Sequence, residues 1–366
     1  MPPFFFGEEI RMKLSIIVPV GRPETARRTV ESILRQGPCP ALVQIILVGA
    51  GLAALREQYR DPRIQYVELP GRLNPSATRI AGVEHATGDW YLFVDDDIEL
   101  EGSFLERLTS VIAGEDHAGA IGARLPGRER SYFSRVTDLA NFWSQQSLHS
   151  GPRDWLYSAV LAVSRRVYAE VGGFAPELAI GEDVDLTRRI RQAGYRVCYQ
   201  SDLVGYHHHR RTTLARALAY GWQNGGLAKF QFKGDPQVRA WSAMMVLRTL
   251  ALSLVATVRE NGRDGHDFYW YLPGIIVFYC VFALSLEWNY QRCLIGFLRA
   301  KGKTSSGGQP AARNVFVRKH VDSSDRGRRG EALFFLVMAI LRENILLILM
   351  VGLLFAVLVS GPCASE

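Results

Sequence analysis

The chain has 366 residues, of which 48% are hydrophobic and 22% charged, with a formal net charge of +7. The hydrophobic share is high for a wholly soluble enzyme and low for a polytopic transporter, and the length allows one large or two modest domains. The five cysteines form no CxxC pair and no zinc spacing, which argues against a disulfide framework or a zinc site and suits a reducing compartment.

The first hundred residues alternate predicted strands and predicted helices. Short apolar runs rich in β-branched residues predict strands over residues 13–20, 43–50, 64–70 and 90–97. Apolar residues at helical spacing predict helices between them, over residues 22–37, 52–62 and 74–88. This alternation predicts parallel strands, right-handed crossovers and a doubly wound α/β sheet. In such sheets ligands bind beyond the carboxyl ends of the strands.

After residue 100 the pattern loosens. Helices are expected over residues 104–114, 165–173 and 181–195. The last of them has acidic residues early and arginines late, which matches the helix dipole. Residues 196–211 indicate one or two strands that end in a basic, histidine-rich edge.

The C-terminal third contains three apolar stretches, at residues 242–258, 268–288 and 332–360. Ten Lys or Arg residues lie between the last two stretches, which favours an anionic membrane surface over nucleic acid as a partner. By the positive-inside rule we expect that basic loop, and the catalytic domain, in the cytoplasm at the cell membrane. The expected organisation is a catalytic domain, a membrane hairpin, a basic cytoplasmic loop and a last membrane segment, over residues 1–234, 235–290, 291–331 and 332–366.

Two further features indicate how the chain is arranged at the membrane. The N-terminus shows no charged region followed by an apolar one, so we expect no cleaved signal peptide and a cytoplasmic N-terminal domain. In the hairpin, residues 242–258 are marginal in length and carry Arg248, so an interfacial helix lying flat on the membrane is the alternative to a span.

The acidic triplet Asp95, Asp96 and Asp97 follows the predicted strand over residues 90–97. In an extended strand Asp95 and Asp97 would face the same side, because side chains alternate. Two such carboxylates make a hard-oxygen site for Mg²⁺ or Mn²⁺, with substrate phosphates completing the shell. A solvated loop or a helix cap is the alternative, which the preceding strand and the following acidic turn make less favourable.

Glu182 and Asp183 open the helix predicted after the glycine-rich turn of "GGFAPELAIGEDVDLTRR". A carboxylate at that position can be aimed into a cleft and serve as general base for a hydroxyl. The alternative is ordinary N-capping with i,i+4 pairs, such as Asp185 with Arg189. The occurrence of this segment downstream of a strand-end Asp-x-Asp favours the catalytic interpretation.

The segment "YHHHRR" (206–211) is the third candidate. If the segment is extended, His207 and His209 face one way and His208 the other. A neutral imidazole is a plausible third metal ligand, and Arg210 or Arg211 could neutralise a diphosphate. A solvated basic loop is the alternative.

Over about residues 13–230 the sequence resembles the family 2 inverting glycosyltransferases, which share the A-type nucleotide-sugar fold. Three segments carry the resemblance in order: "SIIVPVGRPETARRTVESIL", "ATRIAGVEHATGDWYLFVDDDIEL" and "GGFAPELAIGEDVDLTRRIRQAGYRV". The resemblance implies a divalent cation, a UDP- or GDP-sugar donor and direct displacement at the anomeric carbon. Catalysis is expected from Asp183 and Glu182, the former as base. The implied donor-binding residues are Pro19, Val20, Arg22, Glu24, Arg79, Asp95, Asp96 and Arg210, and the metal ligands Asp95, Asp97, His207 and His209.

The sequence departs from the family pattern in four places. The family often carries an aspartate after the second strand that reads the nucleobase, where this chain has Gly49, Ala50 and Gly51. Ile80 replaces an asparagine, and "GGFDE" is "GGFAPE". "QVRAW" (237–241) is not the QxxRW of processive synthases, which favours transfer of a single sugar.

The membrane segments favour an acceptor presented at the bilayer, such as a glycan on a lipid carrier. Alternatively, the anchor only localises a soluble reaction. Two other functions stay open: a non-catalytic membrane scaffold with this fold, and a nucleotidyltransferase. The latter requires a glycine-rich loop near the first strand, of which "VPVGRPE" is a poor version.

Overall fold

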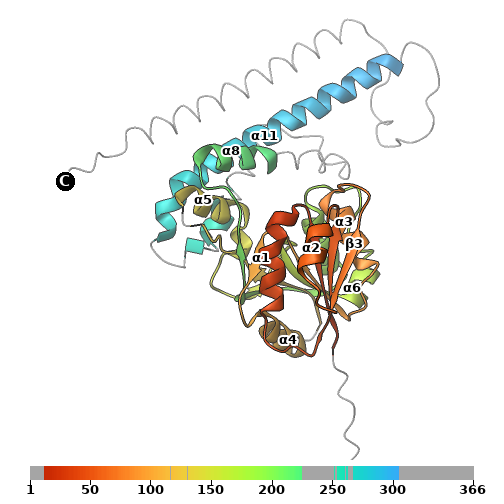
Figure 1. The fold of residues 1–366 in the computed structure, drawn as a ribbon. Coiled ribbons are helices and arrows are strands. Elements are labelled where there is room, and N and C mark those ends of the chain that lie inside the picture. Colours follow the sequence, from red (N-terminus) through yellow and green to blue (C-terminus); the bar gives the residue numbers. More distant parts are fainter. Residues whose placement is uncertain are drawn as a thin grey trace, which may run out of the picture. The chain divides into compact units, whose positions relative to one another are not determined.

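A computed structural model describes residues 12–115, 117–129, 131–224, 251, 254–259, 261–262 and 267–304. These residues form a central sheet with helices on both faces (Figure 1). The strands are β1 (Leu14–Val20), β2 (Leu42–Gly49), β3 (Ile64–Glu68), β4 (Trp90–Val94), β5 (Ile98–Leu100), β6 (Ala118–Arg124), β7 (Gly151–Pro152), β8 (Val160–Ser164) and β9 (Arg196–His207). The helices are α1 (Pro23–Leu34), α2 (Ala53–Gln58), α3 (Pro75–Val83), α4 (Phe104–Gly114), α5 (Tyr132–Asn141), η1 (Trp143–Gln145), α6 (Arg165–Glu170), α7 (Glu182–Gln192), α8 (Leu214–Asn224) and α11 (Asp267–Thr304).

The sheet order is β3-β2-β1-β4-β8-β6-β9-β5, with β7 paired to β9. The strands β3, β2, β1 and β4 are parallel, with Ile16 opposite Ile45 and Leu92 in register. β8 runs antiparallel to both β4 and β6, and β6 is parallel to β9. The sheet is therefore mostly parallel in its first half and mixed in its second. Because β1, β2 and β4 end at one edge, the loops after them gather there.

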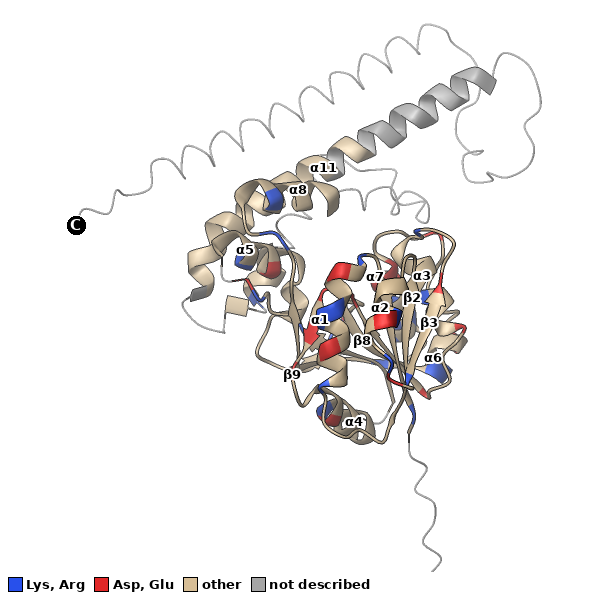
Figure 2. Cartoon of the chain, viewed as in Figure 1, with Lys and Arg blue, Asp and Glu red and all other residues tan. Residues whose placement is uncertain are grey.

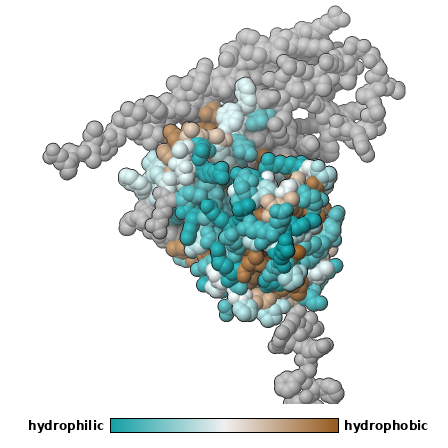
Figure 3. All heavy atoms as spheres, in the orientation of Figure 1, coloured by the Kyte–Doolittle hydropathy of each residue, from teal (hydrophilic) through white to brown (hydrophobic). Residues whose placement is uncertain are grey.

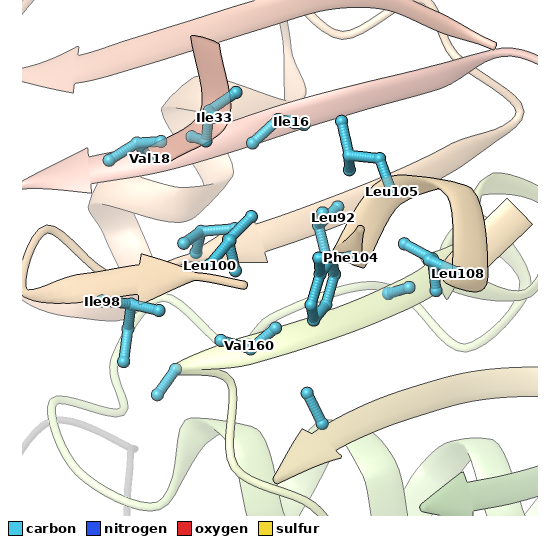
Figure 4. Packing of buried hydrophobic residues seen from close by; sticks show 14 of the residues in the cluster. Ile16, Val18, Ile33, Leu92, Ile98, Leu100, Phe104, Leu105, Leu108 and Val160 are labelled. Carbon is cyan, nitrogen blue, oxygen red and sulfur yellow. The ribbon is translucent and has the colours of Figure 1, made fainter. Parts of the chain in front are cut away.

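Each face of the sheet has its own hydrophobic core, because successive strand side chains alternate. On one face Ile16 and Val18 of β1 pack against α1, α2 and α4, as Figure 4 shows for Ile33, Phe104 and Leu105. On the other face, side chains of α3, α6 and α7 pack against strand residues that include Ile17 and Phe93. The two cores fix the helices whose N-terminal ends border the carboxyl edge of the sheet.

The doubly wound α/β fold is confirmed, and so are the seven elements from β1 to β4 within a few residues. The helices predicted over 104–114 and 181–195 are α4 and α7, and residues 196–207 form one strand, β9. The sequence interpretation missed β5, β6, β8 and α5. The strand predicted over residues 90–97 ends earlier, at Val94.

The chain divides into two units, residues 1–217 with 256–271, and residues 218–255 with 272–366. The first contains the sheet, together with the first turn of α11. On the face that Figure 3 shows, the surface of the described residues is mainly hydrophilic, and small apolar patches lie among the hydrophilic residues. In the second unit the Ser285 hydroxyl of α11 donates to the Trp222 carbonyl of α8.

One helix among the described residues is long and apolar enough to cross a membrane, by length and composition: the stretch Phe268–Ser285 of α11. It coincides with the apolar stretch predicted over residues 268–288. Most of the stretch 242–258, the basic loop from 305 on and the stretch 332–360 lie outside the described residues. The predicted boundary at residue 234 also lies outside them, so the four-part organisation stays a prediction.

Candidate functional site

The acidic triplet lies in a turn between β4 and β5. The turn is closed by the amide of Ile98, which donates to the Asp95 carbonyl at 3.2 Å. The expectation that the strand extends through Asp95 and Asp97 is therefore wrong, although the charge of Asp97 still acts on Asp95 across the turn. Instead the three carboxylates have three different sets of partners.

Asp96 holds the loop after β1. Its Oδ2 accepts the backbone N–H groups of Gly21 and Arg22 at 2.8 and 2.7 Å. Burial raises the pKa of Asp96 to about 6, although these two hydrogen bonds oppose the shift. The carboxylate thus fixes the ends of β1 and β4 to each other. This places Pro19, half-buried, and Val20, buried, beside the acidic turn.

Asp97 lies among cationic and imidazole groups. Its Oδ1 is 3.3 Å from Nε2 of His207, at the end of β9, and its Oδ2 is 3.5 Å from the guanidinium of Arg22. Burial alone would raise the pKa of Asp97, but His207, Arg211 and Arg22 outweigh it and hold the pKa well below its ordinary range. The carboxylate is therefore ionised throughout the neutral range.

Arg79 of α3 joins the two acidic motifs (Figure 2 colours the charged residues). It is 3% exposed, and its terminal nitrogens lie 2.6 Å from Asp95 Oδ1 and 2.8 Å from Glu182 Oε1. Its guanidinium also lies over the ring of Phe174, at 5.6 Å. Burial opposes its charge, yet the two carboxylates outweigh that effect and raise its pKa. Arg79 thus forms a bridge within the protein, and its predicted approach to the nucleotide stays a prediction.

Asp183 is the second residue of α7, which begins directly after Gly181, whose positive φ of 78° turns the chain into the helix. Its Oδ2 accepts the Ser158 amide at 3.2 Å and its Oδ1 accepts the Val184 amide at 2.8 Å. Burial and the adjacent Glu182 raise the pKa of Asp183 to about 7, against these hydrogen bonds and Arg79. Such a pKa near neutrality is suited to a general base.

The predicted pair of Asp185 with Arg189 also forms, on the same helix at 2.6 Å. Glu182, in contrast to Asp183, is buried and bound by Arg79. Its predicted catalytic role stays a prediction. The first turns of one helix thus carry three different carboxylates: Glu182 in an ion pair with Arg79, Asp183 bound by two backbone amides, and Asp185 in a half-buried ion pair with Arg189.

The three consecutive histidines have different partners. His207 and His209 lie side by side, with ring centroids 5.1 Å apart, whereas Nε2 of His208 is 2.7 Å from Glu99. His209 is buried and its ring nitrogens contact Asp138 at 2.7 Å and the Arg211 amide at 3.3 Å. With both nitrogens engaged, His209 has none free for a metal ion, so these contacts do not support its predicted role as a ligand.

The structure does not bring every predicted residue to the acidic turn. Arg210 is exposed, and Arg211 is the arginine of this segment whose charge acts on Asp97. Glu24 is exposed in the first turn of α1, where a negative charge favours the helix end. Ser158 and Asp138 are site residues that sequence reasoning did not select, since neither stands in a motif, whereas Arg211 belongs to the predicted "YHHHRR" segment.

A divalent cation fits Asp97 and His207 better than the full predicted set. No group of three or more His, Cys, Asp or Glu residues suited to a metal occurs in the described part of the chain. Asp97 and His207 nevertheless form a carboxylate–imidazole pair, and Nδ1 of His207 is buried with no hydrogen-bond partner. Mg²⁺ commonly binds through one or two protein groups with substrate phosphates completing its shell. Asp95 is engaged by Arg79.

The loop after β2, where the family often carries an aspartate that reads the nucleobase, is held by contacts within the protein. A Cβ on Gly49 would lie 2.3 Å from the Val20 carbonyl, so the ends of β1 and β2 need glycine to approach this closely. The amides of Gly51 and Leu52 donate to the carboxylate of Glu68 at 2.6 and 3.1 Å. The loop after β2 is thus tied to the end of β3.

Residues 15–169 match the family described as "Glycosyl transferase family 2". This part of the chain is therefore similar in sequence to the family 2 glycosyltransferases. The match starts within β1 and ends within α6, so it includes the acidic turn and Arg79 but stops before α7.

Curated relatives agree with this assignment. The chain is 29% identical over 231 residues to the O-antigen biosynthesis protein RfbC of Myxococcus xanthus, which is 56% of this chain and 18% of that protein. It is 28% identical over 194 residues to the pre-mycofactocin glycosyltransferase of Mycobacterium tuberculosis, at 50% and 41% coverage. It is 25% identical over 253 residues to the glycosyltransferase AglE of Haloferax volcanii, at 66% and 79%. The chain spans less than half the length of the first two relatives.

A solved structure supports the same fold. The mannosyltransferase PcManGT of Pyrobaculum calidifontis, determined in complex with GDP-Man and Mn²⁺, has a TM-score of 0.53 and 16% sequence identity. The similarity covers 77% of this chain and 88% of that one. At this identity the comparison establishes the A-type fold.

Proposed function

We propose that this chain transfers a sugar from a nucleotide-sugar donor to the hydroxyl of a membrane-presented, lipid-linked acceptor, with inversion, in glycan or polysaccharide biosynthesis. The observation that carries the proposal is the buried bridge Asp95–Arg79–Glu182, which ties the acidic turn to the helix that begins with Asp183. It joins a donor-binding edge to a carboxylate whose pKa suits a base.

The chemistry is a direct displacement. The acceptor oxygen attacks the anomeric carbon while the bond from that carbon to the diphosphate oxygen breaks, and the electron pair leaves with the diphosphate. Asp183 takes the acceptor proton, a contribution on the order of 10²–10⁴ in rate. Attack from one face while the leaving group departs from the other inverts the configuration.

The departing diphosphate gains negative charge, which this edge of the sheet is arranged to receive. A divalent cation held by Asp97 and His207 would supply electrostatic stabilisation of that charge. Arg22, whose side chain is about half exposed, and Arg211 both act on the charge of Asp97 and add positive charge. A UDP- or GDP-sugar fits this arrangement, because both carry the diphosphate that these groups recognise.

The membrane part of the proposal is supported by the start of α11. Trp270 is 73% exposed at one end of the apolar stretch Phe268–Ser285, as interfacial aromatics are. Within the catalytic unit, the Tyr132 ring of α5 lies 5.3 Å from that of Tyr271. The start of the candidate span is therefore attached to the domain that carries Asp183. An anchor there brings the domain to an acceptor at the bilayer surface.

The test uses the full chain in nanodiscs. UDP-, GDP-, dTDP- and CDP-sugars are supplied with Mg²⁺ or Mn²⁺, and release of the nucleoside diphosphate is measured with and without a membrane extract as acceptor source. We expect turnover of one donor class that depends on the cation, and NMR of the product should show an inverted anomeric centre. Absence of nucleotide binding and of turnover with every donor would refute the proposal.

A further inference from the structure

The segment Asp154–Ser158, "DWLYS", approaches Asp183 from the loop before β8. It alternates in burial: Leu156 and Ser158 are 0% and 1% exposed, whereas Trp155 and Tyr157 are half-buried. This is the pattern of an extended chain with one face in the core. The two large aromatic rings therefore lie together on the outer face of the segment.

Three backbone hydrogen bonds fix this segment against the candidate catalytic helix and its neighbour. The amides of Leu156 and Ser158 donate to Thr187 Oγ1 and Asp183 Oδ2, each at 3.2 Å. The amide of Tyr157 donates to Gln145 Oε1 at 2.6 Å. The amide that binds the Asp183 carboxylate thus belongs to the residue that directly follows Tyr157 in the chain.

The rings continue as an aromatic wall. The centroid of Trp155 lies 4.8 Å from that of Tyr157 and 5.7 Å from that of Trp143, both edge-to-face. Tyr157 in turn lies 4.8 Å from Phe142, which is 5.1 Å from His207. The wall thus runs between the two halves of the site, from the imidazole beside Asp97 to the amide that binds Asp183.

Packing alone does not account for the partial exposure of this wall. Phe142, at 5% exposure, supplies a buried contact beneath Tyr157. Trp143, Trp155 and Tyr157 keep part of their surface open, and the Tyr157 hydroxyl is held by the Asn141 carbonyl. Fixed, amphipathic rings of this kind supply a large contact area at low entropic cost, as ligand sites use them.

We propose that Trp155 and Tyr157 form the platform for the acceptor's sugar ring, which rests on the proposed transfer reaction. The apolar C–H face of a pyranose matches an aromatic ring, while its hydroxyl groups stay free to reach a base. Holding that ring beside Asp183 positions one hydroxyl for proton transfer, which is the purpose of an acceptor site. The acceptor is thereby a glycan rather than a bare lipid alcohol or phosphate.

The test compares Trp155→Ala and Tyr157→Ala with Tyr195→Ala, a half-buried ring whose hydroxyl contacts Glu170 at the surface. The probes are methyl and octyl glycosides of glucose, galactose and mannose, titrated onto the full chain in nanodiscs. Saturation-transfer NMR reports which probe protons contact the protein. Transfer kinetics with the accepted donor report the KM of each substrate.

For the wild type we expect saturation of the ring protons of at least one glycoside. Trp155→Ala should raise the acceptor KM by about tenfold or more and leave the donor KM unchanged, and Trp155→Phe should recover part of the loss. Unchanged acceptor KM in both alanine variants, or saturation of octyl protons alone, would overturn the platform. If the alanine variants fold poorly, the phenylalanine variants and the wild-type proton map decide the question.

This outcome is separable from that of the proposed function. Nucleotide binding, followed by thermal shift with UDP or GDP and Mn²⁺, and turnover of the donor test the transfer reaction without any platform residue. A wild-type chain that turns over donor but shows no glycoside contact would retain the proposed function and lose the platform.

Discussion

The acidic turn and the start of α7 present carboxylates in one site with opposite acid–base properties. Asp97 has its pKa held well below its ordinary range by His207, Arg211 and Arg22, whereas burial and Glu182 raise the pKa of Asp183 to about 7. The residue type is the same, so the difference lies in the surroundings. A permanently ionised group suits a cation and its diphosphate, and a group that titrates near neutrality suits proton transfer.

The strongest way to break this comparison is Asp183→Asn. The amide keeps the size of the side chain but cannot accept the acceptor proton, so we expect transfer to fall by roughly 10²–10⁴-fold. Thermal shift with nucleotide and Mn²⁺ should be unchanged, because the acidic turn is intact. Asp185→Asn, on the same helix and in a half-buried ion pair with Arg189, is the control and should retain its rate. Near-full transfer by Asp183→Asn would remove the assignment of the base.

The bridge between the two regions is tested by Arg79→Met. The substitution leaves Asp95 and Glu182 facing each other without a cation, and breaking a buried pair in this way typically costs about 3–5 kcal/mol. Denaturant titration of the full chain in detergent measures the loss. Arg63→Met removes an ion pair with Asp61, in which the side chain of Arg63 is 41% exposed. For that control we expect about 0–1 kcal/mol, and equal losses in both variants would contradict the role of the bridge.

The proposed role of Asp97 in binding the cation and the nucleotide is tested by Asp97→Asn. Because Asp97 is proposed to hold the cation itself, its loss should weaken Mn²⁺–nucleotide binding by at least the roughly 10–100-fold that removing an outer-shell partner of a metal site costs. Isothermal titration with Mn²⁺ and GDP or UDP measures this directly. Asp61→Asn, a surface aspartate paired with Arg63, serves as the control. Unaltered affinity would show that Asp97 does not hold the cation.

The smallest expected effect is the pH dependence of transfer. Because the pKa of Asp183 is raised to about 7, the base is mostly protonated at pH 6 and mostly ionised at pH 8, so the rate should rise by about tenfold between them. Over the range from its ordinary value of 3.8 up to about 7, the folded chain holds a proton that the unfolded chain releases. The contribution of this group to stability therefore falls as pH rises through that window. A flat rate profile from pH 6 to 8 would contradict the shift.

The fold was readable from the sequence where strands are buried runs of β-branched residues, as in β1 and β2. The second half of the sheet was not, and β6 shows the reason. A Cβ on Gly119 would lie 2.6 Å from Ile190, and one on Gly122 would lie 2.8 Å from Leu156, so the strand needs glycine where α7 and its neighbour pack closely. Its sequence, "AGAIGAR", therefore lacks the composition of a strand.

The candidate site shows a similar division. Asp95, Asp97 and Asp183 were found because they stand in recognisable segments, and their chain order was informative. The contact of Arg79 with Glu182 joins residues 103 positions apart, and the partner of Ser158 lies 25 residues away. Such contacts depend on the crossing of α3, α7 and β8, which no local pattern encodes. The turn at Asp95–Asp97 was misread as a strand because its aspartates continue an apolar run.

The two amides that Asp96 binds have a consequence for phosphate recognition. Loops that cradle phosphates commonly do so with free backbone N–H groups at a helix N-terminus. Here the hydrogens of Gly21 and Arg22, just ahead of α1, are already committed to an internal carboxylate. The pyrophosphate of a donor must therefore be met by flexible guanidinium arms and a counterion. Recognition of that kind is sensitive to ionic strength in a way that a rigid amide nest is not.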